Sequence, residues 1–121
     1  MSKRRVVVTG LGIISPIGIG LDQAWNSITA ARSGITKISR FDASAFASQI
    51  AGEVKGFEVT QYLSAKEARR MDIFIHYGMA AAIDAIKDSG LEVTPKNAER
   101  IGVNIGSGIG GLKMIEDTHD D

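Results

Sequence analysis

Two short runs of Val and Ile without alternating polar residues stand toward the two ends of the chain, at residues 4–10 and 101–106. Continuous apolar runs of this length are typical of strands that are buried on both faces of a sheet. Each run leads into glycines, which allow a sharp turn or a close approach of backbones. The pattern therefore predicts two buried strands in a sheet covered by helices, and hence the α/β fold class.

Apolar residues recur at helical spacing in two segments between these runs. Leu21, Trp25 and Ile28 share one face of a helix of about three turns that begins near residue 21. We expect Trp25 to pack on the sheet as a core anchor. A longer pattern predicts a helix over residues 65–89, ended by Gly90. Its middle is apolar almost all round, so we expect it to be central and closely packed through small residues.

Three more elements follow from local signals. Ser64 and Glu67 have the spacing of a capping box at the start of the long helix. Residues 49–54 predict one short strand in an otherwise irregular region. A last helix begins near residue 111 and runs into an acidic tail without a C-terminal glycine. We interpret this tail as a chain that ends inside a helix.

Three basic residues gather in the first turns predicted for the long helix: Lys66, Arg69 and Arg70. Positive charge at a helix start opposes the helix dipole, at a cost of about 0.3 to 1 kcal/mol per charge. Two interpretations stay open at this point. The cluster is either a solvated helix end, with Glu67 and Asp72 nearby, or a surface that binds a partner.

Composition narrows the class of protein without identifying it. The chain has 121 residues, 44% hydrophobic and 23% charged, and its 14 Lys and Arg balance its 14 Asp and Glu. This is the composition of a globular domain, and the charge balance predicts neither nucleic acid nor a membrane surface as a partner. No apolar run has the length of a membrane span or a signal-peptide core, so we expect a cytoplasmic protein.

Cysteine is absent, and two histidines are present. The chain therefore has no disulfide, no thiolate metal site and no thiol nucleophile. His76 lies on the long helix, where we expect a core or interface histidine. His119 lies near Glu116, Asp120 and Asp121 in the acidic tail, but such oxygen and nitrogen groups at a chain terminus commonly bind nothing, and we predict no metal site.

The glycines after the second apolar run also fit a different class of protein. Gly106, Gly108 and Gly111 have the G-x-G-x-x-G spacing of a dinucleotide-binding turn. A nicotinamide-binding unit also needs an acidic residue about 20 positions further on, and the chain ends at Asp121, before that position. A nicotinamide-binding domain remains an alternative.

Many landmarks together resemble one family, the bacterial 3-oxoacyl-acyl-carrier-protein synthase II family, over essentially all 121 residues. They follow one another in the order of the N-terminal part of that family. The landmarks are Arg4 to Gly12 with Ser15, Pro16 and Gly18, Phe41-Asp42, Ala51-Gly52, Met71-Asp72, Asp88 to Leu91, and Ile105 to Gly111.

The resemblance implies the thiolase-like fold, in which two similar α/β halves stack as an αβαβα sandwich. It implies decarboxylative condensation of an acyl-enzyme with malonyl-carrier protein during fatty acid elongation, by a homodimer, and we predict no cofactor. Residues 1–121 would form an incomplete N-terminal half. The family's nucleophilic cysteine and its two histidines lie beyond the matched positions, so no catalytic residue is carried over and we expect the chain alone to be inactive.

Two surfaces do carry over by position. Lys66, Arg69 and Arg70 occupy the family positions that dock the acidic helix of acyl carrier protein, which favours the partner interpretation of the basic cluster. Ile109 matches the position that lines the acyl-chain pocket near the dimer interface. The alternative within the same resemblance is a non-catalytic fragment that only binds carrier protein or dimerises.

Overall fold

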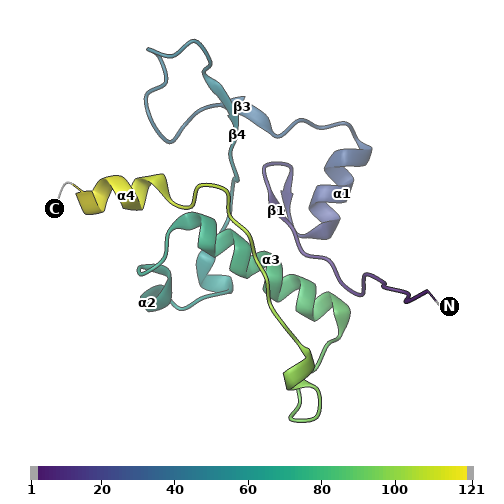
Figure 1. Cartoon of the computed structure of the whole chain (residues 1–121). Helices are drawn as coiled ribbons and strands as arrows, with labels where there is room; N and C mark the ends of the chain where they lie inside the picture. The colour runs from purple at the N-terminus through teal and green to yellow at the C-terminus, as the bar shows by residue number, and fades with distance from the viewer. Residues whose placement is uncertain (1–2, 120–121) are drawn as a thin grey trace.

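The computed structural model describes residues 3–119 as a set of helices and two small hairpins around one long helix (Figure 1). The elements in chain order are β1 Ile14–Ser15, β2 Gly18–Ile19, α1 Leu21–Thr29, β3 Ile35–Lys37, β4 Ile50–Gly52, the 3-10 turn η1 Val59–Gln61, α2 Ala65–Ala68, α3 Ile73–Ser89, the 3-10 turn η2 Ala98–Arg100, and α4 Leu112–His119.

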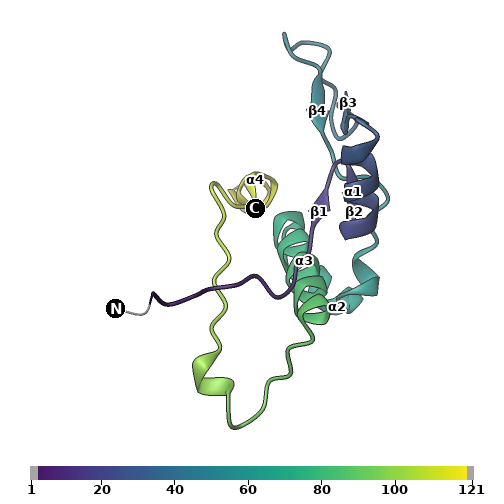
Figure 2. The same cartoon turned by 90° about the vertical axis from the view of Figure 1, so that its right-hand side faces the viewer.

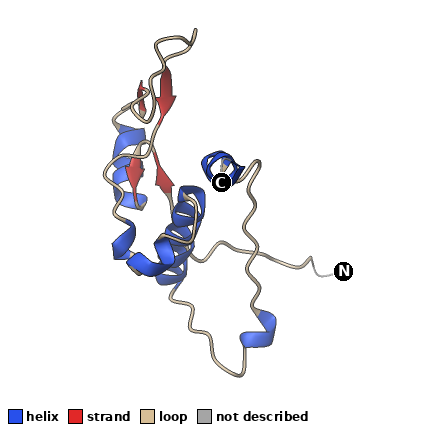
Figure 3. Ribbon diagram, turned by 90° about the vertical axis from the view of Figure 1, so that its left-hand side faces the viewer, coloured by secondary structure: helices blue, strands red, loops and turns tan. Residues whose placement is uncertain are grey.

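The strands form two separate antiparallel pairs (Figure 3). In the first pair Ile14 faces Ile19, and the Ser15 hydroxyl donates to the Gly18 carbonyl over 3.0 Å. In the second pair Ile35 faces Gly52. The second pair confirms the short strand predicted over residues 49–54, and α1 confirms the predicted helix near residue 21.

Helix α3 packs against β1 and against chain segments from both ends of the sequence, and small residues make these close approaches possible. A Cβ atom at Gly12 would overlap the α3 backbone at Ala81 and Ala85, so the chain before β1 lies directly against the helix. Further along α3, the Ile105 side chain approaches Gly78 to 3.7 Å of where a Cβ would stand. Two segments far apart in sequence therefore cross one helix at its smallest residues.

Polar and aromatic contacts anchor α3 to the preceding chain. The Leu11 amide donates to the Asp88 carboxylate over 2.8 Å. Phe57 stacks on Tyr62 at 5.9 Å between ring centroids and meets the Tyr77 ring edge to face at 5.1 Å. The Tyr62 hydroxyl donates to Asp84 over 3.0 Å, and burial, followed by this carboxylate, raises the pKa of Tyr62. These contacts hold residues 57–62 along the helix.

The two buried strands predicted at residues 4–10 and 101–106 are wrong for this structure. Both segments are extended but pair with no strand among residues 3–119, and both run outside the helices in Figure 2. Val6 is 87% exposed and Val103 is 78% exposed. The physical reason is that a strand is completed by hydrogen bonds to a neighbouring strand, and the described residues provide none for either segment.

The single long helix predicted over residues 65–89 is also wrong. The structure has two helices, because Asp72 adopts an extended backbone with φ −72° and ψ 160° and caps the start of α3. The predicted end is confirmed, since Gly90 has a left-handed φ of 66° and follows the last residue of α3. The predicted capping box at Ser64 and Glu67 is present, but it starts α2.

Trp25 is not the core anchor that its spacing predicted. Its side chain is 65% exposed and lines an open hollow with Leu11, Leu21 and Ile28. The buried apolar residues of the described chain are small except for one: Ala24, Ala43, Leu63, Ala68 and Ala80. The apolar face of α1 is present as predicted, and the described residues leave it uncovered. Among residues 3–119, no helix combines the length and the apolar character that a membrane crossing requires.

Candidate functional site

Helix α2 spans only four residues, and its first end is fixed by reciprocal hydrogen bonds. The Glu67 amide donates to the Ser64 hydroxyl over 3.3 Å, and the Ser64 amide donates to the Glu67 carboxylate over 3.1 Å. The Ser64 hydroxyl also donates to that carboxylate over 2.6 Å. This side-chain bond, with the backbone bond, holds the pKa of Glu67 below its ordinary value.

The second end of α2 is fixed by α3. The His76 ring nitrogen Nε2 lies 2.9 Å from the Ala68 carbonyl oxygen, and both residues are at least partly buried. A carbonyl oxygen can only accept, so Nε2 carries the proton and donates it. The sequence predicted a core or interface histidine, and the structure places His76 partly buried between two helices.

The three basic residues, Lys66, Arg69 and Arg70, lie together on α2 and the turn after it, and we call them the basic segment. All three are exposed. Within residues 3–119 the only ion pair joins Lys113 and Asp117, so no described carboxylate pairs with the basic segment. Glu67, its nearest acid in sequence, is directed back to Ser64. The cationic groups therefore face solvent without an internal partner.

The break before α3 corrects the electrostatic argument made from the sequence. Lys66 is the second of the four residues of α2, and only Arg69, its C-cap, stands at the negative end of the helix. Cations are favourable there, whereas they would oppose the dipole at the start of a long helix. The predicted penalty assumed one long helix, so it cannot serve as an argument for a partner.

Ile109 lies in the turn before α4 and is 75% exposed. The turn is closed by the Gly110 amide, which donates to the Ser107 hydroxyl over 3.1 Å. Gly110 has a φ of 82°, which favours glycine, and the Phe74 ring lies 3.8 Å from where its Cβ would stand. The turn that presents Ile109 thus rests on the first turn of α3.

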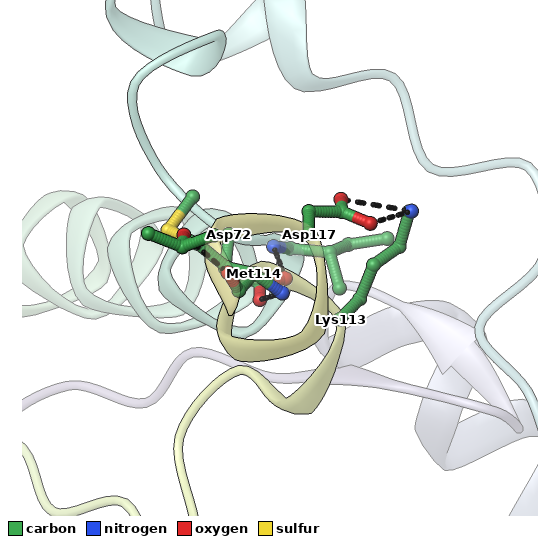
Figure 4. A network of polar contacts seen from close by, with 6 residues as sticks. Asp72, Lys113, Met114 and Asp117 are labelled. Carbon is green, nitrogen blue, oxygen red and sulfur yellow. Dashed lines mark hydrogen bonds and ion pairs between the residues drawn. The ribbon is translucent and has the colours of Figure 1, made fainter. Parts of the chain in front are cut away.

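Asp72 connects the start of α3 with the start of α4 (Figure 4). Its carboxylate accepts a hydrogen bond from the Ile73 amide over 2.5 Å and another from the Met114 amide over 3.4 Å. Gly111 leaves no room for a Cβ atom against this side chain. One carboxylate therefore accepts backbone amides at the starts of two helices, where such amides lack partners within their own helix.

Beside this junction, α3 and α4 enclose an open apolar hollow of about 590 Å³. Its lining includes Phe74, Ile75, Met114 and Ile115. On the outer face of α4, Lys113 and Asp117 form an ion pair of 2.9 Å, and the hydrogen bond that the Lys113 ammonium donates to this carboxylate raises the pKa of Lys113.

His119 lines the same hollow, apart from the basic segment. Its possible ligand partners Asp120 and Asp121 lie outside the described residues. Residues 3–119 contain no group of three or more His, Cys, Asp or Glu side chains that could hold a metal ion.

Sequence reasoning missed Asp72 and His76 as parts of the site. Asp72 had a usable signal, because an Asp directly before an apolar run is a common helix N-cap, but the run was read as continuous with the Ser64 start. His76 had no local signal. Its contact with Ala68 depends on how the chain folds back between two helices, which residue spacing does not reveal.

The helices and strands define the class of protein as part of an α/β domain. This domain presents the basic segment on one side of the start of α3 and the glycine turn on the other. Residues 3–121 match the family model of the beta-ketoacyl synthase N-terminal domain. The chain belongs to this family. The fold class predicted from the sequence, part of the N-terminal half of a thiolase-like α/β sandwich, is confirmed.

Relatives in several bacteria support the same family. The chain is 57% identical over 119 residues to a 3-oxoacyl-(acyl-carrier-protein) synthase 2 from Vibrio cholerae, which covers 98% of this chain and 29% of the relative. It is 52% identical over 117 residues to the enzyme of that name from Synechocystis, covering 97% of this chain and 28% of the relative. The chain therefore spans less than a third of the length of these relatives.

A solved structure supports the fold. The ishigamide ketosynthase/chain length factor aligns with 75% of this chain and 23% of its own, at a TM-score of 0.69 and 38% identity. The resemblance recognised from sequence landmarks is confirmed by these comparisons.

Proposed function

We propose that this chain is the N-terminal portion of a cytoplasmic, homodimeric 3-oxoacyl-acyl-carrier-protein synthase of the second type. Such an enzyme condenses an acyl-enzyme with malonyl-carrier protein by decarboxylation during fatty acid elongation. Within it, the described residues dock the carrier protein and contribute to the acyl-chain pocket. The observation that carries the proposal is the basic segment: three exposed cations without an internal ion pair, on a helix fixed at both ends.

The basic segment suits an acidic partner helix. Lys66, Arg69 and Arg70 share one short stretch of backbone, so their charges act on the same region of a partner. Complementary charge of this kind steers association and orients the complex more than it adds affinity. Exposed charges are screened over about 8 to 10 Å at ordinary ionic strength, so binding through them depends on salt.

Ile109 is the proposed contribution to the acyl-chain pocket. Its side chain is exposed on a turn whose backbone is held by Ser107 and Phe74. A fixed turn presents one apolar side chain in a defined position, as a pocket for an alkyl chain requires. Phe74 also lines the apolar hollow between α3 and α4.

We further propose that these 121 residues alone do not catalyse condensation. An acyl-enzyme thioester needs a thiolate, and the chain contains no cysteine. Incubation with malonyl-carrier protein labelled in the carboxyl group and with an acyl-carrier protein should release no carbon dioxide above background. Turnover by the pure chain would contradict this. A non-catalytic carrier-binding chain is the alternative, and the coding sequence that follows residue 121 distinguishes the two.

The central test is a titration of a fluorescently labelled bacterial acyl carrier protein with this chain, at low and at high salt. We expect weak binding that falls as salt rises. The double variant Arg69→Glu, Arg70→Glu should lose it, because it reverses two of the three charges.

A matched control is Lys96→Glu, Arg100→Glu, which makes the same charge change at two exposed positions around η2. It should bind nearly as the wild type does. Equal loss in both double variants would show that only net charge matters, and equal binding by the wild type and the Arg69, Arg70 variant would refute the basic segment as the docking surface.

A further inference from the structure

We propose that His76 is a positioning residue for carrier-protein docking: through its Nε2–H bond to the Ala68 carbonyl, it fixes the orientation of the basic segment on α3. This inference rests on the proposed function, because it concerns how the same surface is held. It adds a residue that does not itself touch the partner and that carries no required charge.

Helix α2 cannot hold its own orientation. Isolated helices this short do not persist in water, because nucleation is unfavourable and few hydrogen bonds follow it. The carbonyls in the last turn of a helix also lack intrahelical donors. The Ala68 carbonyl is such a group, and it receives two donors: the Met71 amide over 3.3 Å and His76 Nε2 over 2.9 Å. The shorter of the two comes from α3.

The Ala68 carbonyl, which His76 holds, is directly connected to Arg69 and Arg70. The Ala68 carbonyl and the Arg69 amide belong to one planar peptide group, so a donor that fixes the carbonyl also fixes the plane from which Arg69 departs. The Arg69 amide in turn donates to Ala65 over 3.3 Å, and the Arg70 amide donates to Glu67 over 3.0 Å. The direction of both arginine side chains therefore follows from the peptide that His76 holds.

The two ends of α2 have separate supports. Ser64 and Glu67 close the first end within the helix itself, and His76 closes the second from a neighbouring helix. Loss of the His76 bond leaves the end that carries Arg69 and Arg70 with local backbone hydrogen bonds alone, so this end loosens while the capping box remains. A basic segment that is no longer held keeps its three charges but not their fixed arrangement. An experiment can therefore separate the effect of position from the effect of charge.

The experiment compares His76→Ala, His76→Gln and the Arg69→Glu, Arg70→Glu pair in the same titration of labelled bacterial acyl carrier protein. Removing one hydrogen bond of this kind should weaken binding by roughly three- to tenfold in His76→Ala. The dependence of log affinity on log salt should keep its wild-type slope, because no cation is removed. The arginine pair should instead flatten that slope. His76→Gln, whose amide can donate, should restore binding to within about twofold of the wild type.

Equal affinity of the wild type and His76→Ala, or no restoration by His76→Gln, would overturn the proposal. A nuclear magnetic resonance arm decides it without a partner. In the free chain, the His76 ring should carry its proton on Nε2, and His76→Ala should move the amide signals of residues 66–70 while those of α4 stay in place. A proton on Nδ1 alone, or unchanged signals over residues 66–70, would contradict it.

The two proposals fail in different ways. If the wild type does not bind carrier protein at all, the proposed function fails, and the amide and ring signals still test whether His76 holds α2. If the wild type binds with the expected salt dependence and the His76 variants match it, only the positioning role fails. A folding defect in His76→Ala would appear as a loss of α3 amide signals. In that case the amide signals of residues 66–70 in His76→Gln are compared with those of the wild type instead.

Discussion

The chain from residue 57 to residue 90 and the two extended segments, 3–13 and 101–111, all contain many apolar residues but differ in how their backbone hydrogen bonds are satisfied. Residues 57–90 form an aromatic cluster, two helices and the contacts between them. The extended segments expose most of their Val and Ile side chains and pair with no strand among residues 3–119.

The difference shows where the required hydrogen bonds come from. A helix satisfies its backbone within a few residues of sequence, so the hydrogen bonds of α3 need no neighbouring segment. A strand depends on hydrogen bonds to a neighbouring strand, and residues 3–119 provide none for these two segments. The extended segments approach α3 closely at glycines, where Gly12 lies against the helix backbone and Ile105 lies over Gly78. We therefore expect substitutions nearby in sequence to change the helical regions, and contact with another protein chain to change the extended segments.

The largest expected effect is self-association through the extended segments. Val6, Val7 and Val103 are at least 70% exposed, and an unpaired extended backbone with apolar side chains favours pairing with another chain. Light scattering at rising concentration should show species larger than a monomer, together with binding of an apolar dye. Val7→Lys should reduce both, because a charged edge opposes pairing, whereas Gln61→Lys on η1 should not. A compact monomer without dye binding at high concentration would show that the segments need no partner.

The next effect compares two glycines in the two extended segments. Gly12→Ala places a methyl group against the α3 backbone and should cost about 1 to 3 kcal/mol, as overpacking does. Gly102→Ala meets nothing within 4 Å and should be neutral or stabilise by about 0.4 to 1 kcal/mol. Urea unfolding followed by the fluorescence of Trp25, which lines a hollow with Gly12, measures both. Equal midpoints for the two variants would mean that segment 3–13 does not pack on α3 as described.

The distinction between local hydrogen bonds and those to distant residues also explains which elements the sequence predicts. Local signals were reliable: the capping box of Ser64 and Glu67, the glycine after α3, and the starts of α1 and α4 lie where the pattern indicated. Predictions that depended on distant residues failed. The Val and Ile runs indicated buried strands, but burial and pairing belong to the whole sheet. Trp25 lies on an apolar helix face as predicted, yet the described residues do not cover it.

The candidate site also contains two kinds of residues: those that the sequence indicated and those that only folding brings together. Lys66, Arg69, Arg70 and Ile109 came from the resemblance to a family, since nothing in their spacing specifies a carrier protein or an alkyl chain. The contacts that hold them, through Asp72 and His76, join residues that are neighbours only after folding. Their roles in binding stay predictions for the experiments above.

A smaller effect is expected at Asp72, where the packed region meets the segment that leads into α4. Asp72→Ala removes the acceptor of the Ile73 and Met114 amides, and the loss of a helix cap costs about 0.5 to 2 kcal/mol. The Met114 amide signal should move and the α4 signals should approach random-coil values. The control is Asp22→Ala, an acid in the first turn of α1 where no side chain caps the helix. If α4 is unchanged in Asp72→Ala, the junction in Figure 4 does not hold it.

The smallest effect is a pH dependence confined to α2. Hydrogen bonds from Ser64 lower the pKa of Glu67 below its ordinary value of 4.5, so the folded helix favours the charged carboxylate. The stabilisation is present above pH 4.5 and is lost as pH falls through the lower pKa of the folded state. The amide signals of residues 65–68 should therefore change below pH 4.5, while those of the extended segments should not follow the same curve. Glu67→Gln retains a residue that can complete a capping box and removes the titration, so its α2 signals should be insensitive over that range. If the wild type and Glu67→Gln show the same pH profile at residues 65–68, the capping box is not the source of the dependence, and α2 is not the locally stabilised element that the comparison with the extended segments requires.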